Sequence, residues 1–597
     1  MKLRNVTMTM TVCVAMAWPA CAQTSKNTRL GKRPNVVLIM TDDQGYGDLA
    51  CHGHPFVKTP NLDKLYGDSV RLTNYHVSPV CSPTRAALMT GRHSQHVGVS
   101  GTGGRQHLII RGIPIAAEIF ADNGYRTGAF GKWHLGSVYP YRPNDRGFQE
   151  TLVHGAGAIS TIGDIWGNDY FDDSYWHNGK KEQFKGFCTD VWFDHATRFI
   201  KVSKDAGKPF FCYIPTNIVH GPHYAPRKYI DMYEGKPEDR PLFAAITHFD
   251  RRVGELRDFL DKQGIAENTI FIFTTDNGGT RTRIFNAGMK GSIGSGYDGG
   301  HRVPFFIHWP REELTGGRDV DQLSAHLDVL PTLIDLCGLR TKPGYKTDGL
   351  SLKPVLDGTR DHLDDRILIE SHRGVVMTKR WRLVTLKIKR ARKNAKNPGT
   401  VAPSELYDVQ KDPGQKRNLA AAHPEIVAQL SAELDRVNQR NAEADQRYVI
   451  GSDRHNPVEF TPDHWHDRKG LGWWQSGIIA GGGAPASILV EVDRDGTYEF
   501  RLRRWPEAVD QPISSAAKMR VPSNAYGGTK MVPGKALPVV KAKLKVAGFD
   551  KTIEVTDNMA EAMFTVPLKK GKIDIYSEFL DNDGNGFGVH YLYVKRR

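Results

Sequence analysis

The sequence predicts an α/β fold in which a mostly parallel sheet is flanked by helices, followed by a small α+β C-terminal subdomain and an added antiparallel β module. Two observations support this prediction. Between about residues 34 and 365, short apolar segments alternate with amphipathic helical patterns, the order that builds parallel sheets. After about residue 449, short strands are separated by turn residues instead, which is typical of a β-sandwich-like module.

Four apolar segments are the expected strands of the first sheet. They are residues 35–40, 126–130, 209–214 and 269–274. Residues 242–263 carry apolar side chains at helical spacing, which indicates a helix between the last two strands. These segments place the first unit at residues 34–365.

The two following units have different textures. Residues 366–448 contain short strands at 366–369 and 381–386 and a helix over 424–442, which predicts the α+β subdomain. In residues 449–597, further strands are expected at 541–546, 562–566 and 590–594. Residues 487–492 and 498–502 flank Asp495-Gly496 and are expected to pair as a hairpin.

The N-terminus has the pattern of an export signal over residues 1–22. Lys2 and Arg4 precede a short apolar run that ends in Ala20-Cys21-Ala22. We expect cleavage after Ala22 and a periplasmic or secreted protein without a transmembrane segment; lipid anchoring at Cys21 is the alternative. The formal net charge of +15 favours polyanionic partners. Nucleic acid is not expected because no nucleic-acid motif occurs, and polysaccharide sulfates suit an exported protein better.

Seven cysteines occur in the chain, and five of them follow the export signal. They are Cys51, Cys81, Cys188, Cys212 and Cys337. Their spacing matches neither a metal-binding motif nor a dense disulfide framework. If Cys81 is kept for chemistry, the other four allow at most two disulfides, and we expect them to be small buried hydrophobic residues instead.

The segment from Cys81 to Arg92 contains the most informative residues of the chain. Ser82 is a candidate N-cap, Pro83 suits the first turn of a helix, and Gly91 is a candidate helix stop. Cys81 would then lie at the positive end of a helix, where anions and activated nucleophiles are stabilised. A capped helix with a buried cysteine is the alternative for this segment taken alone.

Polar residues follow each of the four expected strands directly, at the sheet edge where sites of open α/β folds form. The oxygen donors among them are Asp42, Asp43, Asp276 and Asn277. Such a set suits a hard divalent cation, with calcium favoured over magnesium. The accompanying cations and proton carriers are Arg85, Lys132, His134, His220 and Lys290. A divalent metal with several positive side chains is suited to hold an oxyanion.

These motifs resemble those of formylglycine-dependent (type I) sulfatases of the alkaline-phosphatase superfamily. The matching segments are Asn35–Asp48 (NVVLIMTDDQGYGD), Cys81–Arg92 (CSPTRAALMTGR), Gly131–Gly136 (GKWHLG), Phe273–Gly279 (FTTDNGG) and Gly288–Pro310 (GMKGSIGSGYDGGHRVPFFIHWP). The likeness extends from about residue 34 to 445. It implies an alkaline-phosphatase-like fold for the first unit and hydrolysis of a sulfate ester.

The resemblance also implies residue roles. Cys81 would be oxidised to formylglycine by a maturation enzyme, and its hydrated aldehyde would be the nucleophile beside a calcium ion held by Asp42, Asp43, Asp276 and Asn277. Arg85 would secure the formylglycine hydroxyl. Lys132, His220 and Lys290 would bind sulfate. His220 or Lys290 would protonate the leaving alcohol, and His134 would help to expel sulfate.

Substrate contacts are expected in irregular segments. Residues 154–175 mix aromatic and acidic groups, including His154, Asp164 and Trp166, as sugar-binding loops do. His301 is a substrate contact or a packed histidine, and His223 is a second histidine beside His220. In the β module, Trp465, Trp473 and Trp474 would bind carbohydrate, or the module braces the first unit, which we favour slightly. Asp581 to Gly586 imitates a calcium loop but lacks Glu at its twelfth position, so a hairpin turn is expected.

We therefore expect an exported sulfatase that removes sulfate from a sulfated carbohydrate or an aryl sulfate. One alternative is a phosphonate or phosphodiester hydrolase on the same scaffold. A second is a catalytically silent glycan-binding protein, which would keep Cys81 unmodified.

Overall fold

The computed structural model of the chain describes residues 33–236, 239–370, 372–385, 404–441, 445–466, 469–517 and 533–597. The expected export signal at residues 1–22 and the candidate lipidation site Cys21 lie outside these ranges. None of the helices in the described part of the chain combines the length and apolar character that a membrane crossing requires.

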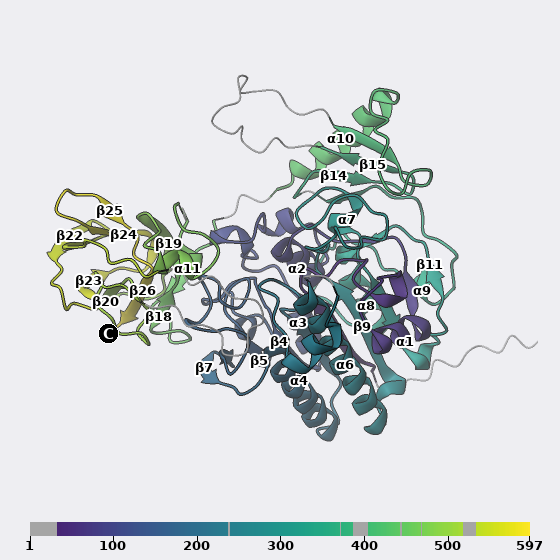
Figure 1. Cartoon of the computed structure of the whole chain (residues 1–597), viewed down its shortest axis with the longest axis horizontal. Helices are drawn as coiled ribbons and strands as arrows, with labels where there is room; N and C mark the ends of the chain where they lie inside the picture. Colours follow the sequence, from purple (N-terminus) through teal and green to yellow (C-terminus); the bar gives the residue numbers. More distant parts are fainter. Residues whose placement is uncertain are drawn as a thin grey trace, which may run out of the picture.

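A ten-stranded sheet is the centre of the first unit (Figure 1). In spatial order, its strands are β11 (Asp319–Val320), β2 (Val70–Leu72), β10 (Phe305–His308), β9 (Thr269–Thr275), β1 (Asn35–Thr41), β8 (Phe210–Pro215), β4 (Arg126–Gly131), β5 (Glu150–Val153), β6 (Ser174–His177) and β7 (Lys180–Gln183). The five central strands, β9 to β5, are mutually parallel, whereas β10, β6 and β7 run antiparallel to their neighbours. The expected mostly parallel sheet is confirmed, with all four expected strands in its middle.

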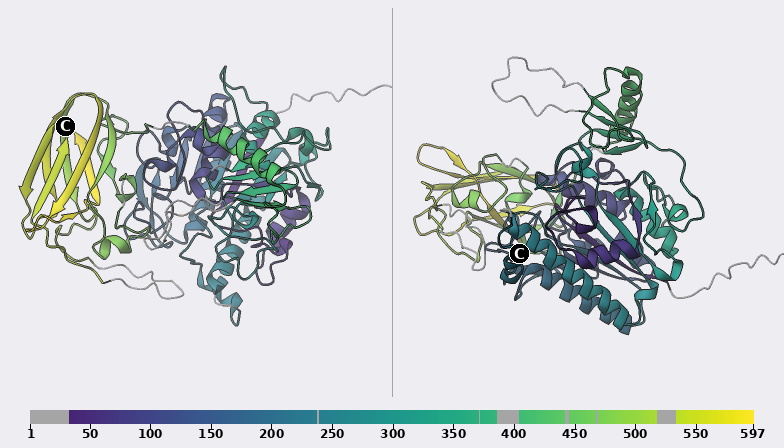
Figure 2. Two further views of the ribbon diagram at one scale, coloured as in Figure 1. Left: turned by 90° about the horizontal axis from the view of Figure 1, so that it is seen from above. Right: turned by 45° about the vertical axis from the view of Figure 1, so that its right-hand side comes forward.

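Helices cover both faces of this sheet because alternate strand residues point to opposite sides. On one face, Val36, Leu38 and Met40 of β1 pack with helices α2 (Cys81–Thr90), α3 (Ala116–Asp122) and α8 (Val329–Cys337). On the other face, Val37 and Ile39 pack with α1 (Pro60–Asp68), α4 (Cys188–Asp205) and α6 (Arg240–Lys262). The long helices α4 and α6 lie side by side (Figure 2). The short helices are α5 (Arg227–Ile230), α7 (Asp298–His301) and α9 (Lys353–Leu356), and two short strands, β3 (Tyr75–His76) and β12 (Ser324–Ala325), pair with each other.

A four-stranded antiparallel sheet forms the second unit. Its strands are β13 (Leu368–Glu370), β14 (Val375–Met377), β15 (Trp381–Val384) and β16 (Glu405–Asp408). Helix α10 (Pro424–Asn438) packs Leu430 and Leu434 against Val376 and Leu383 of this sheet. A buried guanidinium joins the unit to the first one, since Arg382 Nε donates to Asp298 Oδ1 at 3.3 Å.

The C-terminal module contains two sheets around one apolar core (Figure 2). The first has strands β17 (Tyr448–Ile450), β19 (Ala486–Val492), β24 (Gly571–Leu580), β21 (Lys541–Val546) and β22 (Phe549–Glu554), with β25 (Gly586–Phe587) beside β24. The second has β18 (Val458–Phe460), β26 (Tyr591–Arg596), β20 (Gly496–Arg503) and β23 (Ala562–Leu568). The short helix α11 (Ser476–Ile479) lies beside them. Separate C-terminal sheets confirm the expected fold class, while the expected limits at residues 365/366 and 448/449 stay predictions.

The hairpin expected across Asp495-Gly496 is wrong. Strand β19 pairs with β17 and β24, whereas β20 pairs with β23 and β26 in the other sheet. The chain crosses between sheets at this turn, and Asp495 accepts hydrogen bonds from Lys569 Nζ and the Lys570 amide instead. The turn at Asp581 does join two antiparallel strands, β24 and β25, and the Asp581 carboxylate accepts hydrogen bonds from Asp583 and Asn585 within the turn.

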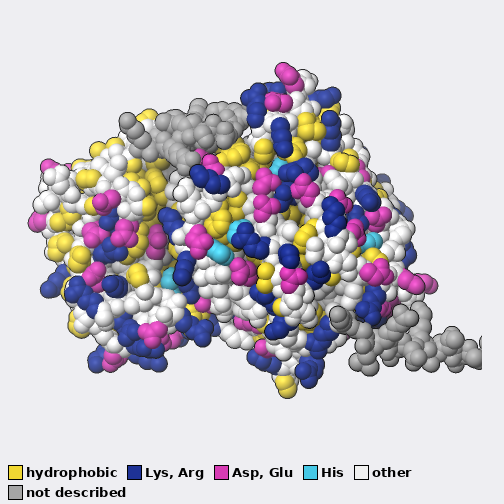
Figure 3. All heavy atoms as spheres, turned by 90° about the horizontal axis from the view of Figure 1, so that it is seen from below, with side chains coloured by type: hydrophobic (Ala, Val, Ile, Leu, Met, Phe, Trp, Pro, Cys, Tyr) yellow, Lys and Arg dark blue, Asp and Glu magenta, His cyan; other side chains and the backbone are white. Residues whose placement is uncertain are grey.

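Surface charge is mixed on the face seen from below. Lysine and arginine side chains alternate there with aspartate and glutamate and do not merge into one basic patch (Figure 3). The net charge of +15 is therefore not concentrated on this face. The five cysteines of the described residues are free thiols; Cys51 is half-buried and the other four are buried.

Candidate active site

Four neighbouring strands bring their C-terminal residues to one point of the sheet edge. Asp42 follows β1, Lys132 follows β4, Asn217 follows β8 and Asp276 follows β9. Backbone hydrogen bonds join the loops: the Asp42 amide donates to Ile218 O at 2.7 Å and the Val219 amide to Asp42 O at 2.6 Å. The loops are therefore one connected structure and not independent turns.

The acidic residues form a buried oxygen cluster next to Cys81. Ligand atoms of Asp42, Asp43 and Cys81 all lie within 4.8 Å of one another. The Asp43 amide donates to Asp276 Oδ1, and Asn277 Nδ2 donates to Asp43 Oδ1 at 2.8 Å. Asn277 Oδ1 is buried without a hydrogen-bond partner, which is costly unless another group fills that role. These residues fit a hard divalent cation, because they offer carboxylate and amide oxygens at one buried point.

Two buried cations are held against these carboxylates. Lys132 Nζ donates to both oxygens of Asp42, at 2.8 and 2.7 Å. Arg85 donates to Asp276 Oδ2 from Nε and Nη2, at 3.1 and 2.6 Å, and to Lys132 O. Burial alone would lower the pKa of both cations, but the facing carboxylates outweigh it and raise the pKa of each. Three carboxylates against two cations leave a net negative charge, as a cation site requires.

Cys81 begins helix α2, and its side chain is 7% exposed. Burial raises the pKa of the thiol well above its usual range, although Lys132 opposes this. An unmodified Cys81 is therefore a protonated thiol and a poor nucleophile. The expected N-cap was wrong: Val80 occupies that position, and Ser82 lies inside the helix, where its hydroxyl donates to His134 O at 2.9 Å. Gly91 ends the helix in the left-handed conformation, as expected.

Two histidines of the expected set flank the cluster with different hydrogen bonds. His134 Nε2 lies 3.0 Å from Thr102 O, and its buried Nδ1 has no partner. Burial and the nearby Lys132 lower its pKa well below 6.5, so the ring is neutral with its lone pair on Nδ1. His220 Nδ1 lies 2.6 Å from Gly221 O, and its Nε2 is 3.8 Å from Asp43 Oδ2.

Lys290 contacts side chains of the second unit. Its ammonium donates to Tyr407 OH at 2.8 Å, lies 3.6 Å from Glu405 and stands over the Tyr297 ring at 4.0 Å. These contacts tie it to strand β16 of the second unit. The structure therefore does not place Lys290 in direct contact with the other expected sulfate-binding groups.

The expected substrate contacts fall into different environments. The Asp164 carboxylate is buried and accepts hydrogen bonds from Gly155, Ser160 and Asn168 of its own loop, and burial raises its pKa to about 7. Trp166 packs edge-on to Trp505 of the module, at 5.7 Å between ring centroids. These contacts favour a structural role for both residues over substrate binding.

The three expected histidine contacts differ in their surroundings. His301 is fully buried, and its Nδ1 lies 3.0 Å from His76 Nδ1, which favours the packed alternative. Burial lowers the pKa of His223 to about 4. His154 is buried near the site, and burial lowers its pKa to about 3, with Lys132 and Arg85 acting in the same direction.

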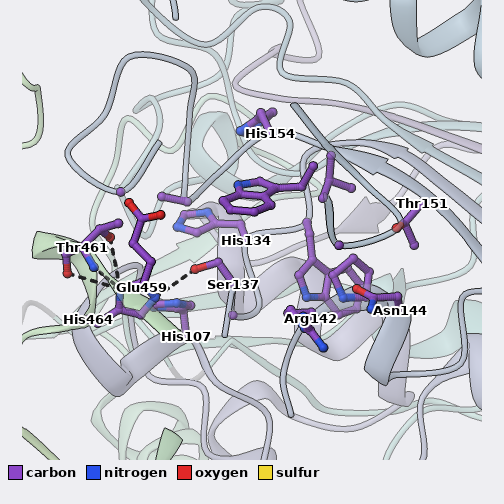
Figure 4. Close-up of a pocket in the computed structure, with 18 of the residues that line it drawn as sticks. His107, His134, Ser137, Arg142, Asn144, Thr151, His154, Glu459, Thr461 and His464 are labelled. Atoms are coloured by element: carbon purple, nitrogen blue, oxygen red, sulfur yellow. Dashed lines mark hydrogen bonds between the residues drawn. The ribbon is translucent and has the colours of Figure 1, made fainter. Parts of the chain in front are cut away.

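A small cavity lies against the ring of His134, between the first unit and the β module (Figure 4). Its volume of about 60 Å³ has room for several water molecules. His107, Ser137 and His154 line it from the first unit, and Glu459 and His464 line it from the module. His464 Nε2 and Ser137 Oγ, 2.9 Å apart, join the two sides. The module thus closes the space behind His134.

Two residues that sequence reasoning left in the module reach the site. Trp473 and Trp474 lie next to the rings of His134 and His220, respectively, at centroid separations of 6.2 and 6.0 Å. More than 250 residues separate the partners in sequence. The sequence shows an adjacent pair of aromatic residues in a polar, glycine-containing loop, but nothing in it indicates which residues of the first unit they meet.

Comparisons with known proteins match most of the chain. A family model described as Sulfatase matches residues 34–339, and one described as N-sulphoglucosamine sulphohydrolase, C-terminal, matches residues 295–440. Residues 449–597 lie outside both matched ranges.

Individual relatives point the same way. The chain is 30% identical over 457 residues to Arylsulfatase A of Homo sapiens, covering 67% of this chain and 87% of the relative. It is 31% identical over 357 residues to N-acetylgalactosamine-6-sulfatase of Canis lupus familiaris, covering 54% and 66%. The crystal structure of Ps i-CgsB in complex with k-i-k-neocarrahexaose has a similar fold, with a TM-score of 0.61, 24% identity and coverage of 70% and 95%.

Proposed function

The chain belongs to the sulfatase family, and we propose that this sulfatase removes sulfate from a sulfated carbohydrate with a formylglycine made from Cys81 and a bound calcium ion. One observation carries the proposal. Cys81 lies at the N-terminus of α2 with its sulfur in the Asp42–Asp43 cluster, and two buried cations adjoin it. This arrangement concentrates anion-stabilising groups around one modifiable side chain.

Asp42, Asp43, Asp276 and Asn277 are the residues that would hold calcium. The unpartnered Asn277 Oδ1 and the carboxylates of the cluster supply the oxygen ligands that this ion prefers. When bound, calcium would lower the free energy of negative charge on the nucleophile and on the sulfate oxygens. Magnesium is the less favoured occupant.

Formylglycine would supply a geminal diol, in which one hydroxyl attacks sulfur and the second later collapses to the aldehyde as sulfate leaves. Arg85 and Lys132 are fixed by Asp276 and Asp42, so they would orient this residue and the sulfate without reorganising during the reaction. The neutral His134 can accept the proton of the second hydroxyl at Nδ1.

His220 is the proposed acid for the leaving alcohol. Its Nδ1 lies against Gly221 O, so the proton for the alcohol would come from Nε2, which is 3.8 Å from Asp43 Oδ2. Lys290 is the other proposed acid and sulfate ligand. Its side chain is 37% exposed and bonded to Tyr407, so sulfate would have to compete with that contact.

The carbohydrate preference rests on relatives and on charge. N-acetylgalactosamine-6-sulfatase is named for a sulfated sugar, and Ps i-CgsB was crystallised with neocarrahexaose. The net charge of +15 favours polyanionic substrates. We also propose that the protein is exported to the periplasm or the medium and that a formylglycine-generating enzyme modifies Cys81.

Two measurements test the proposal. Mass spectrometry of the peptide that contains residue 81 should show a loss of about 18 Da, the change from thiol to aldehyde. Sulfate release should then be measured on sulfated oligosaccharides, aryl sulfates and matched phosphate esters. We expect turnover of the sulfated saccharides, abolished in Cys81→Ala and retained in Cys51→Ala. An unmodified thiol in an inactive protein, or faster hydrolysis of phosphate esters, would contradict it.

A further inference from the structure

A loop of the β module enters the catalytic unit just before helix α11. Trp473 O accepts a hydrogen bond from the Ile162 amide at 3.1 Å, and the Gln475 amide donates to Ser160 O at 3.2 Å. Gln475 Nε2 adds a hydrogen bond to Thr161 O at 3.1 Å. The backbone of the loop is therefore paired with residues 160–162, so its position is fixed by both units.

This pairing sets two indole rings beside the two catalytic histidines. The Trp474 ring lies 6.0 Å from the His220 ring at an interplanar angle of 68°, and the Trp473 ring lies 6.2 Å from His134 at 58°. Both tryptophans are only half-buried. Trp473 packs tightly, because a Cβ added at Gly157 would lie 2.6 Å from Trp473 Cζ2.

Two other tryptophans of the module are buried, so the fold of the module can enclose a Trp ring completely. Trp465 and Trp505 are 4% and 0% exposed and lie in the apolar clusters of the module. Burial of a Trp ring stabilises a fold strongly, so the partly exposed Trp474 indole at the domain junction leaves apolar surface that a ligand can cover. Trp465, which the sequence offered as a carbohydrate contact, is excluded from that role by its burial.

The role proposed for His220 determines which part of the substrate lies next to Trp474. The oxygen that receives the proton from His220 belongs to the sugar, so the sugar ring must lie beside His220 during the reaction. Trp474 lies beside the His220 ring, on the side that faces the module. A sugar presents C–H groups on its faces, and a flat indole offers them a large, rigid apolar contact at low entropic cost.

We propose that Trp474 is a substrate-binding residue that stacks on the sulfated pyranose ring, so that the β module completes the catalytic site. The inference rests on the proposed function. It assigns the module a direct part in substrate recognition, in place of the separate carbohydrate-binding or purely bracing roles. The catalytic residues then bind the sulfate group, and Trp474 binds the sugar ring that carries it.

Kinetics of Trp474→Ala, Trp474→Phe and Leu471→Ala test the inference on the sulfated saccharide that the wild-type protein hydrolyses best. We expect kcat/KM to fall at least about tenfold in Trp474→Ala, as for a stacked aromatic anchor, and to be largely restored in Trp474→Phe. Leu471 lies on the same loop but packs against the apolar cluster that contains Ile478 and Ile479, so Leu471→Ala is the matched control and should stay within about twofold.

Inorganic sulfate is the second probe, because it binds the sulfate pocket without a sugar. Its inhibition constant should be the same in the wild type and in Trp474→Ala, while KM for the saccharide rises. Equal kcat/KM in the wild type and Trp474→Ala would overturn the inference, as would an equal loss in Leu471→Ala. A wild-type protein with formylglycine that releases no sulfate from any saccharide would contradict the proposed function instead.

Discussion

The ammonium of Lys132 donates to both carboxylate oxygens of Asp42, and neither side chain is exposed to solvent. Lys132 directly follows β4 and Asp42 directly follows β1, and β8 lies between these two strands in the sheet. This buried pair links the acidic cluster to Lys132, which is one of the residues proposed above to bind sulfate. Its loss should therefore affect both stability and catalysis.

Replacement of Lys132 by Met should show both effects. Without the ammonium, Asp42 is a buried carboxylate that has lost its main partner, which costs about 3–5 kcal/mol of unfolding free energy in metal-free buffer. The turnover number should fall by about 10² to 10³, the effect of removing one preorganised charge donor. Denaturant unfolding with chelator and sulfate-release kinetics measure the two quantities.

The exposed pair Lys201–Asp205 provides the control for that variant. Its side chains are 58% and 52% exposed, so solvent screens the pair, and Lys201→Met should leave both the unfolding free energy and the turnover number nearly unchanged. If Lys132→Met and Lys201→Met unfolded at the same denaturant concentration, the buried pair would have no special weight.

Calcium should stabilise the protein by binding to the oxygen cluster of Asp42, Asp43, Asp276 and Asn277. Burial and the neighbouring Asp42 raise the pKa of Asp276 to about 6, a repulsion that a bound cation would relieve. At a hundred times its dissociation constant, calcium should add about 2.7 kcal/mol to the unfolding free energy. Thermal unfolding with calcium or with chelator measures this shift.

Two variants locate the calcium effect. Asp43→Asn should reduce the shift strongly, because it removes a carboxylate of the cluster. Asp581→Asn should leave it unchanged, since that carboxylate is exposed and accepts hydrogen bonds within its own turn. A shift that survives in Asp43→Asn but disappears in Asp581→Asn would place the ion in the module turn.

Gly131 should be intolerant of a side chain because of both conformation and space. Its φ is +130°, and a Cβ would lie 2.1 Å from Pro215 O, a backbone atom of the neighbouring strand. Gly131→Ala should cost more than about 3 kcal/mol, the sum of backbone strain and overpacking, and displace Lys132 next to it. Denaturant unfolding should show a lower free energy of unfolding, and kinetic assays should show slower sulfate release.

Gly124→Ala separates the two contributions. Gly124 also has a positive φ, +82°, but a Cβ there would meet no atom within 4 Å. Only the conformational cost of about 1 kcal/mol should appear, with normal activity. Similar losses in both variants would show that the contact with Pro215 is unimportant.

The residues that follow the strands could be predicted from the sequence because parallel strands place their C-termini on one edge. Asp42, Lys132 and Asp276 needed only that rule and the apolar runs before them. Helix α2 was also predictable, although its cap was not: Val80 is an ordinary strand-like residue, whereas Ser82 carries the usual capping side chain.

Contacts between units could not be predicted in the same way. The turn residues Asp495-Gly496 are local and do not distinguish a hairpin from a crossing between two sheets. The direction of Lys290 depends on Tyr407 of the second unit, and the position of Trp474 depends on how the module pairs with residues 160–162. Such placements follow from packing between distant segments, for which spacing and composition give no signal.

The buried histidine His301 should make the protein sensitive to mild acid. Burial lowers its pKa to about 4, and Arg382 and Arg302 act in the same direction while Asp298 opposes them. The unfolded chain takes up a proton near pH 6.5 and the folded chain does not, so stability falls as the pH drops from about 6.5 toward 4. At pH 5 this residue should account for a loss of about 2 kcal/mol relative to pH 7.

His301→Gln tests this dependence. Glutamine keeps hydrogen-bonding groups next to His76 but does not titrate, so the variant should lose about 2 kcal/mol less than the wild type between pH 7 and pH 5. The comparison uses the change with pH in each protein, so any constant cost of the substitution cancels. Gly124→Ala, which changes no titratable group and adds a Cβ that meets no atom within 4 Å, is the control and should follow the wild-type pH dependence. Parallel curves for the wild type and His301→Gln would show that His301 is protonated in the folded protein at pH 5.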